Sequence, residues 1–273
     1  MNREEQILQI LQQNPNLSNR EIGKIVGCHR STVAYYLHKL GIFRDRLQLQ
    51  KLNNTNRNSN IVISDAAKQI LIGTLLGDSH ITKYNRNCES VKILNSCISC
   101  GHSIKQKEYV QYLKSLLESE NIKVNYRENT KRTSRIIDGR IVETVGRCDL
   151  STIRNIQFNS WRDLWYPNNT KVIPREIADI FSALSLAIWY MDDGSKNNCS
   201  YYLHTEGFSL GDIRFLQKLL LSKFNLHTEV HHNRGKNLIY IKARSRELFT
   251  TIIKPYICDS MKYKIIEHNI GSE

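Results

Sequence analysis

The chain has 273 residues, 40% hydrophobic and 24% charged, a composition typical of a folded globular protein and not of a disordered one. Lys and Arg number 39 against 26 Asp and Glu, and the formal net charge of +13 favours a polyanionic partner such as nucleic acid. No signal-peptide core opens the chain, and its most apolar segment, 177–191, is too short to cross a bilayer, so no membrane association is expected.

Three short helices are predicted in the first forty-odd residues. Pro15 ends the first helix, and Ser18 with Glu21 forms a capping box that begins the second. Gly27 closes the second helix and Gly41 the third. Helices joined by a short Gly-containing turn are typical of a helix-turn-helix. The side chains expected to face its core are Ile7, Leu8, Leu11, Ile22, Ile25, Val26, Val33, Leu37 and Leu40.

The third predicted helix leaves polar, basic and aromatic side chains outside this core. Their donors, acceptors and rings suit phosphates and major-groove base edges. The alternative is a small packing domain whose polar face is only solvated, and the basic charge of the chain favours DNA contact over it. The candidate DNA-binding residues are Arg30, Ser31, Thr32, Tyr35, Tyr36 and Lys39.

An Asn-rich stretch, 53–60, has nothing to bury and predicts a linker. It divides the chain into a helix-turn-helix module (1–52), a linker (53–64) and a larger domain (65–273).

The larger domain contains a weak internal duplication, with halves at about 65–175 and 176–268. Each half has the order helix, two strands, helix, two strands, helix, and then a lysine. This order predicts an α+β fold of two pseudo-symmetric halves. The predicted elements are opening helices 70–78 and 184–193, amphipathic helices 105–120 and 210–224, strands 124–127 and 142–150 in the first half, strands 228–232 and 238–241 in the second, and the lysines Lys171 and Lys264.

Cys97, Cys100 and His102 together look like half of a zinc site. No second pair stands at matching spacing, and the run 91–100 predicts a strand in which residues three apart face opposite sides. We therefore do not expect zinc. The seven Cys are scattered and odd in number, which predicts reduced thiols and an intracellular, reducing compartment, either the cytoplasm or an organelle that encodes the chain.

The two opening helices are apolar nearly all round, so each should be buried on more than one face. Gly73, Gly77 and Ala187 are small and would let two helices approach closely. A pseudo-two-fold would then bring Asp78 and Asp193 together at one end. Adjacent carboxylates repel unless a cation lies between them, and Mg²⁺, with Mn²⁺ as a substitute, prefers oxygen ligands. Ordinary helix-end acids are the alternative, but a carboxylate opposes the dipole of a helix C-terminus, and two matched cases favour a metal site.

The segments 71–79 and 186–194 resemble the two signature helices of single-chain LAGLIDADG homing endonucleases. The eighth motif position, which is the metal-binding acid in that family, falls on Asp78 and Asp193. The seventh falls on Asp192, a weaker candidate, and the ninth on Ser79 where the family has Gly. Further matching phrases are 102–109, 164–174 and 253–264, so the resemblance covers about residues 65–268.

This resemblance implies two αββαββα halves whose antiparallel saddles sit in the DNA major groove. It implies a monomer that cuts both strands of a long double-stranded site, with divalent metal held by Asp78 and Asp193. In some family members a lysine of each half lies near the metal-bound water, and these positions fall on Lys171 and Lys264; a solvated or phosphate-contacting lysine is the alternative. The helix-turn-helix lies outside the family pattern and would lengthen the contacted site.

Two other functions share this scaffold. An RNA maturase would bind its own intron RNA and help it splice, and this could coexist with DNA cleavage. A transcription regulator would bind DNA without cutting it. Members of the regulator kind have typically lost the two acids, whereas Asp78 and Asp193 both stand here.

Overall fold

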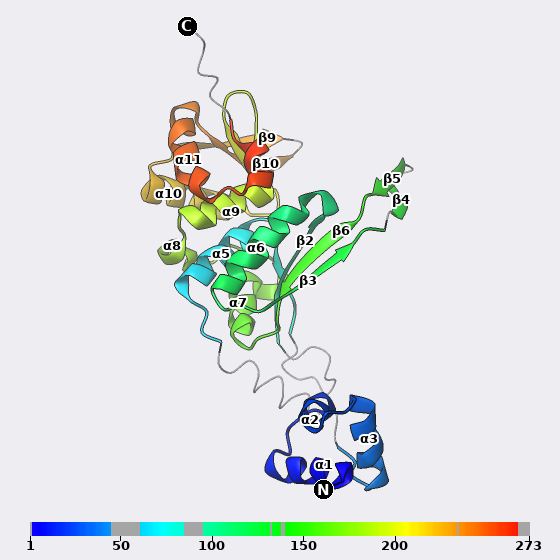
Figure 1. The fold of residues 1–273 in the computed structure, drawn as a ribbon. Helices are drawn as coiled ribbons and strands as arrows, with labels where there is room; N and C mark the ends of the chain where they lie inside the picture. The colour runs from blue at the N-terminus through cyan, green and yellow to red at the C-terminus, as the bar shows by residue number, and fades with distance from the viewer. Residues whose placement is uncertain are drawn as a thin grey trace. The chain divides into compact units, whose positions relative to one another are not determined.

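The computed structural model describes residues 2–44, 61–84, 95–131, 133–137, 140–233 and 235–266, with only the backbone described for residues 133, 135–137 and 140–144. The chain forms two compact units (Figure 1). One contains residues 1–61 with the short segments 83–96 and 154–156, and the other contains 62–82, 97–153 and 157–273. Most of the predicted linker, 53–64, lies outside the described residues. None of the helices in the described ranges has the length and apolar composition that a bilayer span requires.

The N-terminal unit begins with the three predicted helices: α1 (Arg3–Gln13), α2 (Asn19–Val26) and α3 (Arg30–Lys39). Ser18 and Glu21 form the predicted capping box, and Gly27 ends α2 with a φ of 71°. The prediction that Ile25 faces the core is wrong, because 61% of this residue is exposed. Gly23 packs closely against the Cys28 carbonyl oxygen in the turn after α2. The buried side of α2 therefore contains Ile22 and Gly23, and Ile25 lies outside it. The core consists of Ile7, Ile22, Val33 and Leu37.

The larger unit contains two four-stranded antiparallel sheets with the same topology. The order is β1-β2-β6-β3 in the first half and β7-β8-β10-β9 in the second, which supports the duplication predicted from sequence. The strands are β1 (His80–Ile81), β2 (Ile98–Ser103), β3 (Val124–Asn129), β6 (Arg147–Thr152), β7 (Gly194–Lys196), β8 (Tyr201–His204), β9 (Thr228–Asn233) and β10 (Lys236–Ile241).

Helices pack on one side of each sheet, as Figure 1 shows for α6 beside β2 and β6. The opposite side carries exposed and half-exposed side chains, and we call it the open face. The helices are α5 (Asp65–Leu76), α6 (Lys107–Ser119), α7 (Gln157–Trp165), α8 (Ile177–Ile180), α9 (Ala183–Asp193), α10 (Leu210–Phe224) and α11 (Arg246–Ile253), with 3-10 turns at 104–106, 167–169, 243–245, 254–256 and 259–264.

Two predicted strands differ from the structure. The strand predicted at 142–150 is split at Gly146, whose φ of 102° turns the chain between β5 (Arg140–Thr144) and β6. β5 pairs with β4 (Thr133–Ile137), and this hairpin has no counterpart among the described residues of the second half. The strand predicted at 91–100 begins only at Ile98, and residues 91–94 lie outside the described part.

Candidate active site

The two signature helices, α5 and α9, lie side by side and run in the same direction. Near the start of the contact, the Ser185 hydroxyl donates a hydrogen bond to the Gln69 carbonyl oxygen at 2.8 Å. Further along, a Cβ placed on Gly73 would lie 2.8 Å from the Cβ of Ile188. At the end, a Cβ on Gly77 would lie 2.4 Å from the Cβ of Asp192. Because the contacts advance in step along both helices, their C-termini meet at one end of the unit.

Asp78 and Asp193 both lie at this end. Asp78 directly follows the α5 C-cap residue, and 42% of its side chain is exposed. Asp193 is the last residue of α9 and is half-buried. Burial, and then the nearby Asp78, raise the pKa of Asp193 to about 6. Two carboxylates that crowd one another in this way fit a divalent cation with oxygen ligands.

Asp192 contributes a third carboxylate, and it is completely buried. The Tyr109 hydroxyl donates to its Oδ1 at 2.6 Å, and the backbone N–H of Asp78 donates to its Oδ2 at 3.3 Å. Burial raises the pKa of Asp192 well above its usual range, and the charges of Asp78 and Asp193 raise it further. Asp192 therefore belongs to the packed end of the helix pair, beneath the more exposed Asp78.

His102, on β2, lies between these two acids with 1% of its side chain exposed. Its Nδ1 is 3.5 Å from Oδ2 of Asp78, and its Nε2 is 3.7 Å from Oδ1 of Asp192. Burial lowers the pKa of His102, while Asp78 and Gln106 oppose this. In the described part of the chain, Asp78, His102 and Asp192 are the one group of three acids, histidines or cysteines close enough together to hold a metal ion. The sequence did not single out His102 for this place.

The sequence predicted that Cys97 and Cys100 lie in one strand and face its opposite sides, and this is wrong. Both are buried, and β2 begins only after Cys97. The backbone N–H of Cys97 donates to the Thr82 hydroxyl at 3.0 Å, and burial raises the pKa of the Cys100 thiol to about 12.

Lys171 and Lys264 occupy equivalent places at the ends of the two signature helices. The Lys171 ammonium donates to the Ser79 carbonyl oxygen at 2.9 Å, and the Lys264 ammonium to that of Met191 at 2.6 Å. Burial lowers the pKa of Lys171 to about 8 and also lowers that of Lys264, although the nearby acids oppose both shifts. Each ammonium thus satisfies carbonyl groups at a helix C-terminus, where a positive charge is favourable.

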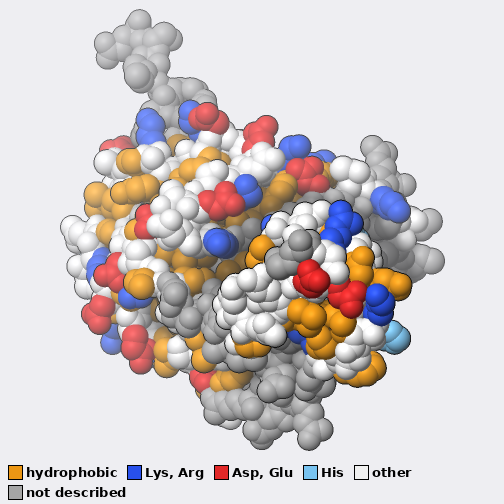
Figure 2. Space-filling view, turned by 60° about the horizontal axis from the view of Figure 1, so that its bottom comes forward, with side chains coloured by type: hydrophobic (Ala, Val, Ile, Leu, Met, Phe, Trp, Pro, Cys, Tyr) orange, Lys and Arg blue, Asp and Glu red, His pale blue; other side chains and the backbone are white. Residues whose placement is uncertain are grey.

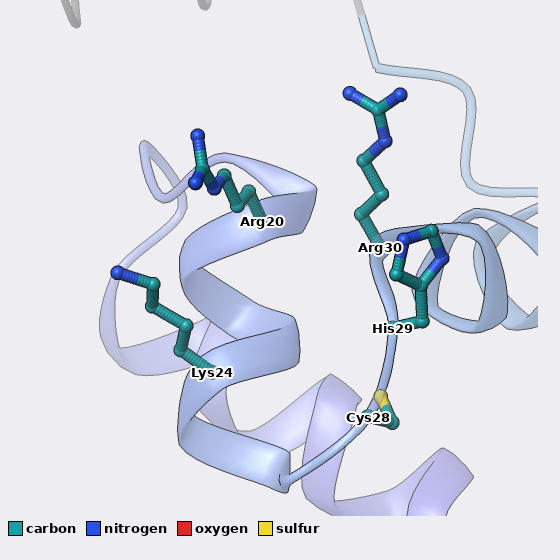
Figure 3. A pocket seen from close by; sticks show the side chains of 5 residues that line it. All are labelled: Arg20, Lys24, Cys28, His29 and Arg30. Atoms are coloured by element: carbon teal, nitrogen blue, oxygen red, sulfur yellow. The ribbon is translucent and has the colours of Figure 1, made fainter.

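A pocket of about 370 Å³ lies in the N-terminal unit between α2 and the start of α3 (Figure 3). Arg20 and Lys24 line it from α2, Cys28 and His29 from the turn that follows, and Arg30 from the first position of α3. Of these residues, the sequence-based set of DNA-binding candidates included only Arg30. The i,i+4 spacing of Arg20 and Lys24 on the second predicted helix was the signal that could have added them.

The other helix-turn-helix candidates lie in different environments. Ser31 and Tyr35 are exposed, and Thr32 is half-buried. Tyr36 packs against the core, and the Lys39 ammonium pairs with Glu4 at 3.0 Å. Figure 2 shows a face of the molecule on which Lys and Arg lie interspersed with Asp and Glu.

Comparison with known proteins agrees with both units. Residues 5–40 match the AsnC-type helix-turn-helix domain, and residues 68–249 match the LAGLIDADG DNA endonuclease family. The chain is 28% identical to a probable intron-encoded endonuclease 1 of Wickerhamomyces canadensis, over 75% of this chain and 85% of that protein. It is also 28% identical to the cytochrome b mRNA maturase bI2 of Saccharomyces cerevisiae, over 80% of this chain and 52% of that protein.

A solved structure shares the fold of the larger unit. The homing endonuclease I-WcaI, bound to its DNA recognition sequence, superposes with a TM-score of 0.62 at 26% identity, over 82% of this chain and 95% of that chain. The paired signature helices, the duplicated sheets and the family match over most of the larger unit lead to one conclusion: the chain belongs to the LAGLIDADG DNA endonuclease family.

Proposed function

We propose that this chain is a site-specific, double-stranded DNA endonuclease of the homing type, which hydrolyses one phosphodiester in each strand. The observation that carries the proposal is the convergence of Asp78 and Asp193 at the C-termini of two parallel, buried helices. Similarity to an intron-encoded endonuclease and to the DNA-bound I-WcaI supports it. Because one chain supplies both acids, the active form is a monomer.

Asp78 and Asp193 would hold the divalent metal, Mg²⁺ with Mn²⁺ as a substitute. When bound, such a metal activates water and neutralises charge on the phosphate. Lys171 and Lys264 are the candidates to assist, since each ammonium lies at the end of the helix that carries the acid of its own half. Lys171 and Lys264 would hold the two acids in place and favour the negative charge that builds up as a phosphodiester is displaced.

The open faces of the two sheets would contact the DNA major groove. In the first sheet, Ser99, Ser151 and Asn125 lie in one cross-strand row that can exchange hydrogen bonds with base edges. In the second, the rings of His231 and Tyr240 are stacked at 4.4 Å and Tyr202 lies beside them. These two faces differ chemically, as an asymmetric target site would require.

The helix-turn-helix would add contacts outside the cleavage site. Arg20, Lys24 and Arg30 line one pocket at the start of α3, and this suits a backbone phosphate. Ser31, Thr32 and Tyr35 are the candidates for base contacts. Tyr36 and Lys39 have partners within the unit, and Lys39 would have to leave Glu4 before it could bind a phosphate.

Neutralising each acid tests the proposal. A target site is first selected from random duplexes with Mg²⁺ and placed in a supercoiled plasmid. Asp78→Asn and Asp193→Asn keep the size of the side chain, so they should nearly abolish double-strand cleavage while gel-shift affinity in Ca²⁺ stays similar or rises. Asp65→Asn, at the opposite end of α5, is the matched control and should cut normally. Asp192→Asn should have a milder effect than the changes at Asp78 and Asp193.

Two outcomes would contradict the proposal. Full cutting by either Asn variant at Asp78 or Asp193 would eliminate the two-acid mechanism. Specific DNA binding without any cleavage by the unmodified chain would favour the transcription regulator.

RNA maturase activity is a second candidate, favoured by the similarity to the yeast maturase over 80% of this chain. It would require specific binding of the host intron RNA and faster splicing when the protein is added. Because splicing needs no DNA-cutting metal site, Asp78→Asn should retain it. A splicing assay with this variant therefore separates the two activities.

A further inference from the structure

Buried residues beneath Asp78 support one side of the active site, given the proposed cleavage function. Equivalent motif positions of α5 and α9 meet across the helix pair: Gly73 meets Ile188 at the third position, and Gly77 meets Asp192 at the seventh. In each pair the first helix supplies Gly and the second a larger side chain. The absence of a side chain at Gly77 is what allows the carboxyl group of Asp192 to lie directly under Asp78.

His102 connects the two acids in this arrangement. The two nitrogens of an imidazole ring point in diverging directions, and here Nδ1 faces Asp78 while Nε2 faces Asp192. Nε2 is buried and has no hydrogen-bond partner within the described ranges. The ring also packs edge-on against Tyr109, whose hydroxyl holds Asp192. The orientation therefore assigns one nitrogen to each carboxyl group and fixes the ring from below.

Among the described residues, no buried histidine takes the equivalent place beside Asp193, although the charge of the more exposed His204 acts on this acid. By strand register, His80 pairs with Ser99 and Ser195 with Tyr202, so His102 corresponds to Thr205. The Thr205 hydroxyl donates to the Asn237 carbonyl oxygen at 2.8 Å, so it is engaged by the backbone of β10.

The histidine of the second half, His204, stands one residue earlier in its strand. A shift of one residue moves a side chain to the other face of a sheet. On that face His204 bonds to Ser195 at 2.9 Å and to Glu206 at 3.0 Å.

We propose that His102 is a positioning residue for Asp78, held in place by Asp192 and Tyr109, and that the two halves of the active site are supported unequally. His102 restricts the orientation of the Asp78 carboxylate and so prepares it to bind metal. The strand whose phosphate lies against Asp78 is consequently the one whose cleavage depends on His102. Groups that orient a metal ligand in this way typically contribute about 10–100-fold to metal affinity or activity.

The test compares the polar variants His102→Asn and His102→Gln with the apolar variant His102→Leu. An Asn amide nitrogen lies near the place of Nδ1 and keeps the contact to Asp78, whereas a Gln amide nitrogen lies near the place of Nε2. Cleavage of each strand is followed separately on a duplex labelled at both 5′ ends, and nicked circles are counted on a supercoiled plasmid. Mn²⁺ binding to the DNA-free protein is measured by electron paramagnetic resonance. Thr205→Val, at the matching buried position, is the control.

For His102→Leu and His102→Gln we expect one strand to be cut about 10–100-fold more slowly, nicked circles to accumulate and Mn²⁺ affinity to fall. His102→Asn should keep most of both properties, and Thr205→Val should change neither. If a variant is less stable, two comparisons still test the proposal: the Asn variant against the Gln variant, and one DNA strand against the other. A purely structural role of His102 would distinguish neither the two variants nor the two strands.

Equal slowing of both strands by His102→Gln, or equal behaviour of the Asn and Gln variants, would overturn the proposal. Failure of the unmodified chain to cut any DNA would refute the endonuclease function. The Mn²⁺ measurement would then still show whether His102 positions Asp78.

Discussion

The close approach of α5 and α9 at the active site can be tested with a double-mutant cycle. In Gly77→Ala the new Cβ would lie 2.4 Å from the Cβ of Asp192. That is roughly 1.1 Å shorter than ~3.5 Å, the lower end of the optimal separation of two non-bonded carbon atoms. The obstructing atom is fixed to a helix backbone, so it cannot rotate away and the helices must separate. Overpacking of this kind costs about 1–3 kcal/mol, and for a unit of about 150–250 residues each kcal/mol lowers Tm by roughly 2–4 °C.

The second arm of the cycle moves the small residue to the other helix. Asp192→Gly removes the three atoms nearest to the new Cβ of Gly77→Ala. Its own cost is about 1 kcal/mol for Gly in a helix, a small cavity, and the loss of the hydrogen bonds from Tyr109 and from the Asp78 N–H. The double variant Gly77→Ala/Asp192→Gly should therefore be more stable than the two single effects added together, with a coupling energy of about 0.5–3 kcal/mol. Thermal unfolding of the four proteins measures it. An unchanged Tm for Gly77→Ala, or strict additivity, would refute the close contact at Gly77.

Three further predictions concern the charges and the N-terminal unit. Lys171→Met and Lys264→Met should slow cleavage more than they weaken DNA binding, because their ammonium groups lie beside the acids; losses of rate and affinity in equal proportion would make them phosphate anchors. Removing residues 1–55 should weaken binding without moving the cut, and footprinting with cleavage mapping checks this; a shifted cut would reject an accessory role. Because the pKa of Asp193 is raised to about 6, its ionisation destabilises the metal-free fold as pH rises from ~4, the value for an unfolded Asp, through 6. The Tm advantage of Asp193→Asn should consequently grow between pH 4 and pH 7, and a constant difference would contradict this.

The duplicated architecture could be predicted because each of its signals is local. The predicted helix 210–224 coincides with α10, and 184–193 differs from α9 by one residue. The split at Gly146 was missed because a run of strand-forming residues does not reveal which of its members turns the chain. Ile25 was misplaced because the core-facing side of a short helix depends on how the following turn packs against it.

For the active site, too, the sequence predicted the features that depend on local signals and missed those that depend on tertiary contacts. The spacing of Asp78 and Asp193 at equivalent repeat positions was visible in the sequence, since both follow directly from the motif. Lys171 and Lys264 could be named from their repeat positions, but nothing in the sequence indicated that their ammonium groups donate to helix-terminal carbonyls. Arg20 and Lys24 needed the turn between α2 and α3 before they shared a pocket with Arg30.

The sequence by itself determined the repeat, the two helix-terminal acids and the basic, helix-turn-helix N-terminus, because hydrophobic periodicity, capping residues and charge act over a few residues. Only the tertiary structure decided that Asp192 is buried beneath Asp78 and that His102 lies between them. Asp192 and Gly77 stand far apart in sequence, and their contact depends on which faces of two helices meet. Whether His102 or Gly101 reaches the buried side depends on strand register, which is set by long-range pairing with β1 and β6.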